Sequence, residues 1–209
     1  TELPFTNYLI AAEAALAQHK FAEAEGYLQK AQPKGRHAVL ALGLMQAKLQ
    51  FAQQDYQAAL TVLKTLQLQA PRHPKVLHLL AETYRQLKNW PALENLLPLL
   101  KKQKAYPEAT LAPLEIETFK ANLQHHQHAK SLKNYWQSLS RTAQQEGELR
   151  DLYLTQLSLL DPTAAEKMLR KTLEQELAPQ LIKLYGQLKD NKPEQRLEHA
   201  ESWLARDAK

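Results

Sequence analysis

A 34-residue period is visible in residues 55–93, which read DYQAALTVLKTLQLQAPRHPKVLHLLAETYRQLKNWPAL. Tyr56 and Trp90 are 34 residues apart, and so are Asp55 and Asn89 directly before them. Small or apolar residues recur in the same register, in the pairs Ala47 and Ala81, Ala59 and Leu93, Leu63 and Leu97, and Leu66 and Leu100. A period of this length predicts one pair of antiparallel helices in each repeat.

The pattern extends in both directions from this stretch. Four residues of an earlier repeat, Phe21, Ala24, Leu28 and Ala31, precede their counterparts by 35 positions. Downstream, the sequence predicts helix pairs in 107–128 with 131–145, in 149–176 around the turn Asp161-Pro162, and in 178–189 with 193–206. Residues 190–193 are expected to form the turn of the last pair.

These repeats resemble tetratricopeptide (TPR) repeats, in which small residues let the two helices of a hairpin approach closely. We therefore expect an all-α, TPR-like, right-handed α-solenoid of about six helix hairpins, with no β-strand. Residues 1–105 are expected to form three regular hairpins, and residues 106–209 degenerate hairpins that continue the same solenoid. A generic helical bundle is the alternative fold.

Both ends of the chain suggest a piece of a longer protein. The sequence begins Thr1-Glu2-Leu3-Pro4 without an initiator Met. Each hairpin of a solenoid packs on its neighbours, and we expect the apolar faces of Leu197 and Trp203 to lack a following partner.

The composition excludes several classes of enzyme. The chain has no Cys, so disulfides, thiolate chemistry and Cys-ligated metal centres are excluded. Its five glycines, at positions 26, 35, 43, 147 and 186, are too far apart for a GxGxxG, Walker A or GxSxG motif. No HExxH motif, signal peptide or membrane-spanning apolar run is present. The residues thus indicate a binding module and not an enzyme.

One histidine cluster, in the sequence His125-His126-Gln127-His128, is the candidate for a haem or metal site. His125 and His128 are three apart and would share a face if both lay on one helix. The segment is polar and has no nearby carboxylate, so a solvated helix end is the favoured interpretation. We expect no cofactor and no metal ion, with haem or porphyrin contact as the alternative.

The first helices of the hairpins are expected to line a groove for a peptide or protein partner. The repeat register places Glu13 in the first hairpin, Lys48 in the second, and Lys75, His78, Glu82 and Arg85 in the third. These charges are mixed in sign. A dense clamp for a C-terminal carboxylate is therefore not predicted.

Positive charge is concentrated in the first half of the chain. Residues 1–105 hold 13 Lys and Arg against 7 Asp and Glu, whereas residues 106–209 hold 14 against 15. An anionic membrane surface and an acidic partner protein are both possible causes. Nucleic acid is not favoured, because the basic residues are not interleaved with exposed aromatics and no recognition motif appears.

Five stretches in order resemble the proteobacterial HemY family, an inner-membrane repeat protein associated with late haem biosynthesis. They are residues 7–15 (NYLIAAEAA), 70–77 (APRHPKVL), 132–141 (LKNYWQSLSR), 181–186 (LIKLYG) and 191–195 (NKPEQ). A flavin-dependent oxidase shares the family's name, and the glycine spacing excludes that enzyme here.

The resemblance implies a non-catalytic scaffold that holds late haem-biosynthesis enzymes together, namely the protoporphyrinogen-oxidising enzyme and ferrochelatase. It also implies two membrane spans before residue 1 and a repeat domain that faces the cytoplasm at the bacterial inner membrane. A porphyrin- or haem-binding chaperone and a generic TPR peptide-binding adaptor are the alternatives. The family supplies no catalytic residues to transfer to this sequence.

Overall fold

The computed structural model describes residues 4–189 and 193–207, with side chains as far as Trp203. In these residues all regular secondary structure is helical, as the sequence predicts. In chain order the helices are α1 (Phe5–Ala17), α2 (Phe21–Lys30), α3 (Arg36–Ala52), α4 (Tyr56–Gln69), α5 (Pro74–Gln86), α6 (Trp90–Lys102), α7 (Glu108–His125), α8 (Ala129–Ser138), α9 (Arg141–Gln145), α10 (Gly147–Leu160), α11 (Pro162–Gln175), α12 (Pro179–Gly186) and α13 (Pro193–Asp207).

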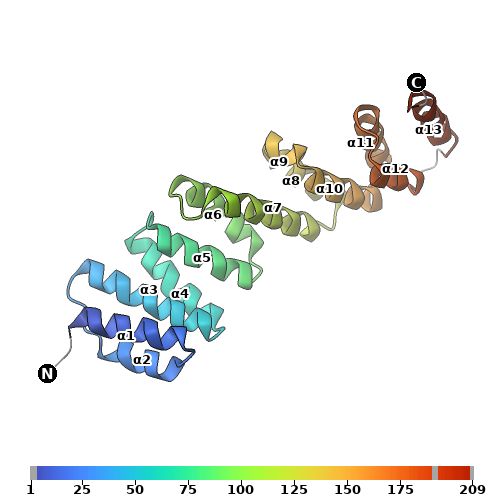
Figure 1. The fold of residues 1–209 in the computed structure, drawn as a ribbon. Helices are drawn as coiled ribbons and strands as arrows, with labels where there is room; N and C mark the ends of the chain where they lie inside the picture. The colour runs from blue at the N-terminus through green and yellow to red at the C-terminus, as the bar shows by residue number, and fades with distance from the viewer. Residues whose placement is uncertain (1–3, 190–192, 208–209) are drawn as a thin grey trace. The chain divides into compact units, whose positions relative to one another are not determined.

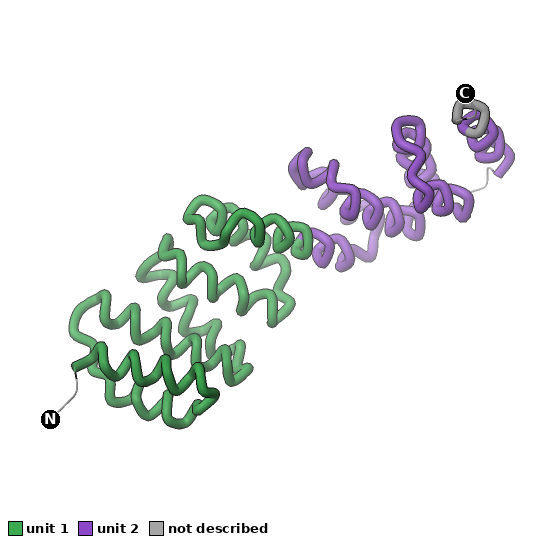
Figure 2. The backbone as a smooth tube through the Cα atoms, viewed as in Figure 1, with its two compact units in different colours: residues 1–118 green, residues 119–209 purple. Residues whose placement is uncertain are grey.

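The chain divides into two compact units, residues 1–118 and residues 119–209, as Figure 2 shows. The boundary falls inside α7. Among the described residues, no helix combines the length and the apolar character that a bilayer crossing requires.

Unit 1 is built from helix hairpins. Helix α1 packs on α2, α3 on α4, and α5 on α6, while α3 also packs on both α1 and α5 (Figure 1). The first helices of the three hairpins therefore lie side by side and form one face of the unit. The second helices begin at Phe21, Tyr56 and Trp90, the aromatic positions that set the repeat in the sequence.

The turns within the three hairpins of unit 1 share one backbone conformation. His19, Gln54 and Lys88 each have a positive φ of 53–64°, in the left-handed region that ends helices. The residue after each of them donates its backbone N–H five residues back, as from Asp55 to the carbonyl of Gln50 at 2.9 Å. In the second and third hairpins, Asp55 and Asn89 then cap the next helix, because their side chains accept from the N–H groups of Ala58 and Ala92.

Small residues form the contacts between the helices of unit 1. Ala24, Ala47, Ala59 and Ala81 are completely buried. Gly43 on α3 is packed so closely that a Cβ there would lie 2.7 Å from Cδ2 of Leu66 on α4. The repeat register therefore predicts which positions must stay small, and the fold is an all-α, TPR-like solenoid.

Unit 2 has a core of aromatic and leucine side chains. The rings of Trp136 on α8 and Tyr153 on α10 are stacked, with centroids 4.4 Å apart and planes 4° apart. Between α10 and α11, Asp161 caps α11 by accepting from the N–H of Ala164 at 3.0 Å. The same carboxylate accepts from Nζ of Lys133 at 2.6 Å, which ties the cap to α8.

The structure corrects the prediction of one helix over residues 131–145. The chain instead forms α8, which ends at Ser138, and the short helix α9. Ser140 caps α9 by accepting from the N–H of Ala143 at 3.2 Å. Gln144 donates to the carbonyls of Trp136 and Leu139, so the freed end of α8 keeps hydrogen-bond partners and the break is stable.

The C-terminal expectation is half right. Leu197 is 61% exposed, as expected, but Trp203 is only 7% exposed. Its ring packs on that of Tyr185 with centroids 5.0 Å apart, so the preceding helix α12 covers Trp203 and the ring needs no following partner. The turn expected at residues 190–193 falls largely at 190–192, which lie outside the described residues.

Candidate functional site

An open pocket lies on the face of unit 1 that α1, α3 and α5 form together. Its volume is about 500 Å³. Four of the six residues predicted to line a partner-binding groove line this pocket, namely Glu13, Lys48, Lys75 and His78. Four residues that the register assigned to a groove thus lie around one pocket, and their contact with a partner stays a prediction.

The floor of the pocket is apolar. Leu9 and Ile10 come from α1, Leu44 and Met45 from α3, and Leu79 from α5. Ile10 is 61% exposed although it is a large apolar residue. An exposed apolar side chain that belongs to a concave apolar surface is typical of a binding site for a protein or small molecule.

The charged groups stand at the rim of the pocket. Nζ of Lys48 lies 3.3 Å from Oε1 of Glu13, which joins α3 to α1. Both side chains are largely exposed, so this pair adds about 0–1 kcal/mol to stability. Lys75 is exposed and forms no ion pair within the described residues. The rim therefore offers one cation that is available to a carboxylate of a partner.

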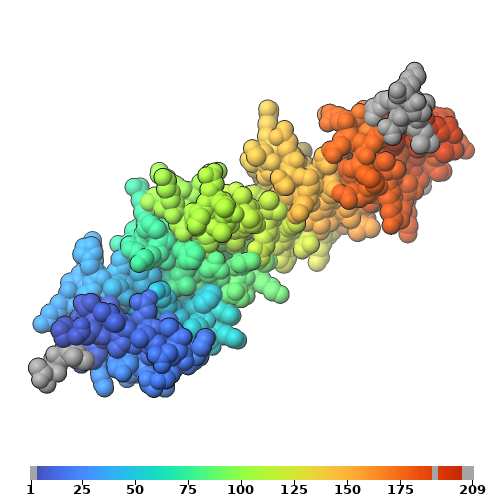
Figure 3. Space-filling model, viewed as in Figure 1, coloured from blue at the N-terminus to red at the C-terminus, as the bar shows by residue number. Residues whose placement is uncertain are grey.

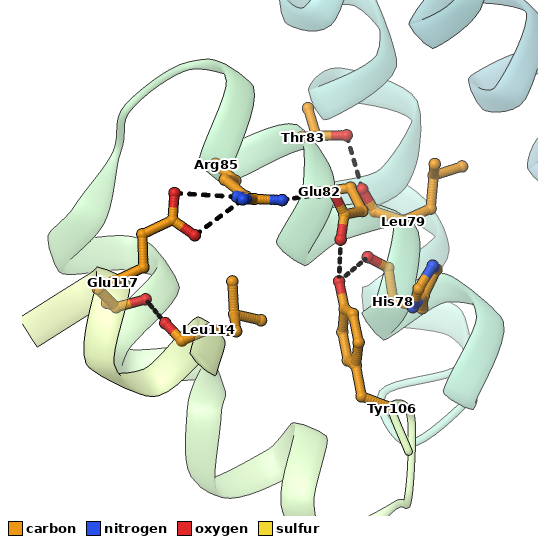
Figure 4. A network of polar contacts seen from close by, with 9 residues as sticks. His78, Leu79, Glu82, Thr83, Arg85, Tyr106, Leu114 and Glu117 are labelled. Atoms are coloured by element: carbon orange, nitrogen blue, oxygen red, sulfur yellow. Dashed lines mark hydrogen bonds and ion pairs between the residues drawn. The ribbon is translucent and has the colours of Figure 1, made fainter. Parts of the chain in front are cut away.

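Tyr106 lies beside His78, which lines the pocket. It lies in the connection between α6 and α7, and its ring centroid is 4.3 Å from that of His78 (Figure 4). Its hydroxyl donates to Oε1 of Glu82 at 2.6 Å and also lies 3.3 Å from the carbonyl oxygen of His78. Burial raises the pKa of Tyr106, and the bond to Glu82 raises it further, so the phenol stays neutral and acts as a donor.

Arg85 and Glu82, the other two predicted groove residues, do not line the pocket. Arg85 forms a two-pronged ion pair with Glu117 of α7, with Nη2 to Oε2 at 2.9 Å and Nε to Oε1 at 3.1 Å. Its Nη1 lies 3.9 Å from Oε2 of Glu82. The hydrogen bond to Glu117 raises the pKa of Arg85. Both residues thus join α5 to the chain segment that follows α6.

Tyr106 and Glu117 were missed by the sequence analysis. Both lie after the last regular repeat, where the 34-residue register no longer assigns positions to faces. A tyrosine in a connection carries no pattern that would reveal a contact with a carboxylate 24 residues earlier.

The histidine cluster does not form a shared helix face. His125 is the last residue of α7, and His128 lies outside the helices as the N-cap residue of α8. Both side chains are exposed, and the ring of His126 lies beside that of Tyr135 with centroids 5.0 Å apart. In the described residues no three His, Asp or Glu side chains come together as a metal site would require.

Comparisons with known proteins agree with the repeat fold. The family described as "Tetratricopeptide repeat" matches residues 15–83. Protein HemY of Escherichia coli strain K12 is 27% identical over 198 residues, which is 93% of this chain and 50% of that protein. Protein HemY of Shigella flexneri matches with the same identity and coverage. The chain thus spans about half the length of the curated relatives it matches.

No solved structure matches the chain. The similarity to HemY runs through both compact units, whereas the tetratricopeptide match lies within unit 1. The chain is thus a TPR-like repeat protein that is similar to HemY over almost its whole length.

Proposed function

We propose that this chain belongs to the HemY family and acts as a non-catalytic scaffold of haem biosynthesis. In this role the pocket of α1, α3 and α5 binds a late-pathway enzyme, either the protoporphyrinogen-oxidising enzyme or ferrochelatase. In the whole protein, membrane spans before residue 1 would hold the repeat domain at the cytoplasmic face of the inner membrane. A scaffold suits this pathway because porphyrin intermediates are apolar and photoreactive, so short transfer distances limit their loss.

The observation that carries the proposal is the open apolar pocket on the face of a chain similar to HemY over 93% of its length. Three parallel helices supply its floor, and the surface is fixed by the packing of three hairpins. Such a preformed surface binds a partner without first having to order itself.

The chemistry of the pocket defines the partner segment. The apolar floor favours a segment with two or three apolar side chains on one face. Lys75 at the rim favours a segment that also carries a carboxylate. The Glu13–Lys48 pair already satisfies the other rim charges.

Photo-crosslinking from the pocket tests the proposal. A photoreactive amino acid replaces Ile10 in the full-length protein within its own membranes, and the crosslinked partners are identified by mass spectrometry. The matched control carries the same amino acid at Leu68 on α4, which is 85% exposed and does not line the pocket. We expect a late haem-biosynthesis enzyme to crosslink from position 10 and not from position 68. Crosslinks to unrelated proteins only, or equal crosslinks from both positions, would contradict the proposal.

A porphyrin- or haem-binding chaperone is the second candidate, and one observation favours it. The imidazole of His78 lines an apolar pocket whose volume of about 500 Å³ suits a flat macrocycle. A haem titration followed by absorbance separates the two candidates. Binding in the micromolar range or tighter, about −8 kcal/mol, that is lost in His78→Ala would favour the chaperone. Loss in His125→Ala/His128→Ala instead would move the site to the histidine cluster. The scaffold function predicts no tight haem binding by the wild-type protein or by any of these variants.

A further inference from the structure

The stacking of hairpins in unit 1 places its connections on two opposite edges. The α2–α3, α4–α5 and α6–α7 connections lie along one edge, and the turns within the hairpins lie along the other (Figure 1). The space-filling view shows the connections between hairpins exposed at the surface (Figure 3). Residues that are far apart in the sequence therefore share one edge.

The edge with the connections between hairpins is strongly basic. Eight exposed Lys and Arg side chains lie in these connections and the helical turns beside them, and we call this set the basic edge: Lys30, Lys34, Arg36, Arg72, Lys75, Lys101, Lys102 and Lys104. The same segments contain one acidic residue, Glu108. None of the eight forms an ion pair within the described residues.

The opposite edge has no such excess. The turns within hairpins and the helical turns beside them contain the basic residues Lys20, Lys88 and Arg85 and the acidic residues Glu23 and Asp55. Lys20 pairs with Glu23 and Arg85 pairs with Glu117. The positive charge of residues 1–105 is thus concentrated on one side of unit 1.

Helix stability explains only part of the basic edge. Lysines in the last turn of α2 and α6 favour the negative end of the helix dipole, which accounts for Lys30, Lys101 and Lys102. Arg36 and Lys75, however, lie in the first turns of α3 and α5, where a positive charge opposes the dipole. Those two first turns contain no acidic residue. Charges placed against the dipole indicate a partner outside the fold.

We propose that the basic edge docks unit 1 onto an anionic lipid bilayer. The charges are spread over three successive connections and do not converge on one pocket, which suits a flat anionic surface. Phe5 and Tyr8 at the start of α1 line a hollow of about 450 Å³ together with Lys30 and Lys34. Aromatic rings beside lysines are the combination that membrane–water interfaces favour.

Lipid headgroups fit this edge better than nucleic acid does. The edge contains no nucleic-acid recognition motif. Six of the eight residues are lysines, whose compact charges need no fixed phosphate geometry and therefore suit mobile headgroups. The inference rests on the proposed function, which places the repeat domain at the membrane. It adds which edge of unit 1 faces the bilayer. It assigns the edge to the bilayer apart from Lys75, which lines the pocket of α1, α3 and α5 and stays with the protein partner.

Sedimentation with lipid vesicles tests the inference. The chain of residues 1–209 is mixed at low salt with phosphatidylcholine vesicles, with or without phosphatidylglycerol. The test variant is Lys30→Gln/Lys34→Gln/Lys102→Gln on the basic edge. The control is Lys20→Gln/Lys64→Gln/Lys88→Gln, which lowers the net charge equally with exposed lysines off that edge. A basic residue near an anionic surface contributes about fivefold in binding, so the test variant should lose on the order of a hundredfold.

We expect the wild-type chain and the control to bind the anionic vesicles, to ignore the neutral ones, and to dissociate as salt is raised. Equal loss in both variants, or no binding to anionic vesicles, would overturn the inference. Edge-dependent binding to polyglutamate or duplex DNA without vesicle binding would assign the edge to a protein or a nucleic acid instead. A pocket variant, Ile10→Ser, should still bind vesicles, so failure of the scaffold function and failure of this inference are distinguishable.

Discussion

The hydroxyl of Tyr106 donates a hydrogen bond of 2.6 Å to Oε1 of Glu82, and this bond fastens the connection before α7 to α5. The side chain of Glu82 is 25% exposed. Its ion pair with Arg85 is long, with 3.9 Å between Oε2 of Glu82 and Nη1 of Arg85. The bond therefore satisfies a carboxylate that water reaches only in part. It also holds the Tyr106 ring beside His78, which lines the pocket.

Replacing Tyr106 by Phe should destabilise unit 1. A hydrogen bond to a charged acceptor is worth about 1.5–3 kcal/mol, and the partial exposure of Glu82 moves the expected loss to about 1–2 kcal/mol. Urea unfolding measures this difference. Tyr8→Phe is the matched control, because the Tyr8 hydroxyl has no hydrogen bond within the described residues, and its change should stay within about 0.5 kcal/mol. Equal effects in the two variants would show that the Tyr106 bond contributes nothing specific.

The free energy of unfolding should fall at alkaline pH because Tyr106 and Tyr185 are harder to deprotonate in the folded state than in the unfolded state. The pKa values of Tyr106 and Tyr185 are raised by burial and by hydrogen bonds to Glu82 and Glu166. A raised folded-state pKa gives a contribution that is complete below the unfolded value of about 10 and is lost as pH rises above it. The unfolding midpoint should therefore decrease more steeply above about pH 10 in the wild type than in Tyr106→Phe/Tyr185→Phe. Parallel curves for the two proteins would contradict this origin.

The carboxylate of Asp161 should stabilise unit 2 in two separable ways. It caps α11, which is worth about 1 kcal/mol, and it pairs with Lys133, which is worth up to about 1 kcal/mol at this partial exposure. Asp161→Ala removes both contributions, whereas Asp161→Asn keeps the cap. Thermal unfolding should rank the wild type first, Asp161→Asn second and Asp161→Ala third.

The carboxylate of Asp161 should also make the stability of unit 2 depend on pH in the acidic range. Lys133 and the N–H of Ala164 lower the pKa of Asp161. A lowered pKa contributes stability above the unfolded value of about 4 and loses it as pH falls through the folded value. The stability difference between the wild type and Asp161→Asn should therefore shrink as pH falls below about 4. A difference that is constant with pH would exclude the ion pair as its cause.

The left-handed turn residues offer a stabilising substitution. Gln54 has a φ of 64°, and a non-glycine residue there costs about 1–2 kcal/mol, which glycine does not incur. Glycine also costs about 0.5–1 kcal/mol in lost chain entropy, so Gln54→Gly should stabilise by up to about 1 kcal/mol. Its neighbour Gln53 has a φ of −76°, so Gln53→Gly should destabilise. Opposite signs in thermal unfolding support the assigned turn, and equal signs would contradict it.

The sequence predicted the regular part of the fold because its repeat positions act locally. Asp55 and Asn89 lie 34 apart because each caps a helix, and Tyr56 and Trp90 follow because those helices begin there. Position alone also assigned Lys48, Lys75 and His78 to one groove, and the structure places all three around one pocket. Each of these inferences needs only the register and the helical period.

The other features of the fold and of the candidate site depend on contacts that the repeat register does not describe. The break after Ser138 follows from the capping by Ser140 and the hydrogen bonds of Gln144, which compete with a continuous helix. Arg85 was assigned to the groove by its position, but the register did not predict its ion pair with Glu117 of α7. In a degenerate repeat these contacts depend on individual side chains, so the 34-residue period does not predict them.

The affinity of pocket variants for a purified partner enzyme tests the central claim most directly. Ile10→Ser removes an exposed apolar side chain from the pocket floor, and Leu68→Ser removes one from α4 outside the pocket. Neither change alters charge, and both should leave the unfolding midpoint nearly unchanged. If the pocket binds the protoporphyrinogen-oxidising enzyme or ferrochelatase, calorimetry should show about tenfold weaker binding for Ile10→Ser, the loss of about 1.4 kcal/mol. The Leu68→Ser variant should bind like the wild type. Wild-type affinity in Ile10→Ser, or no measurable binding of either enzyme to the wild-type protein, would contradict the claim.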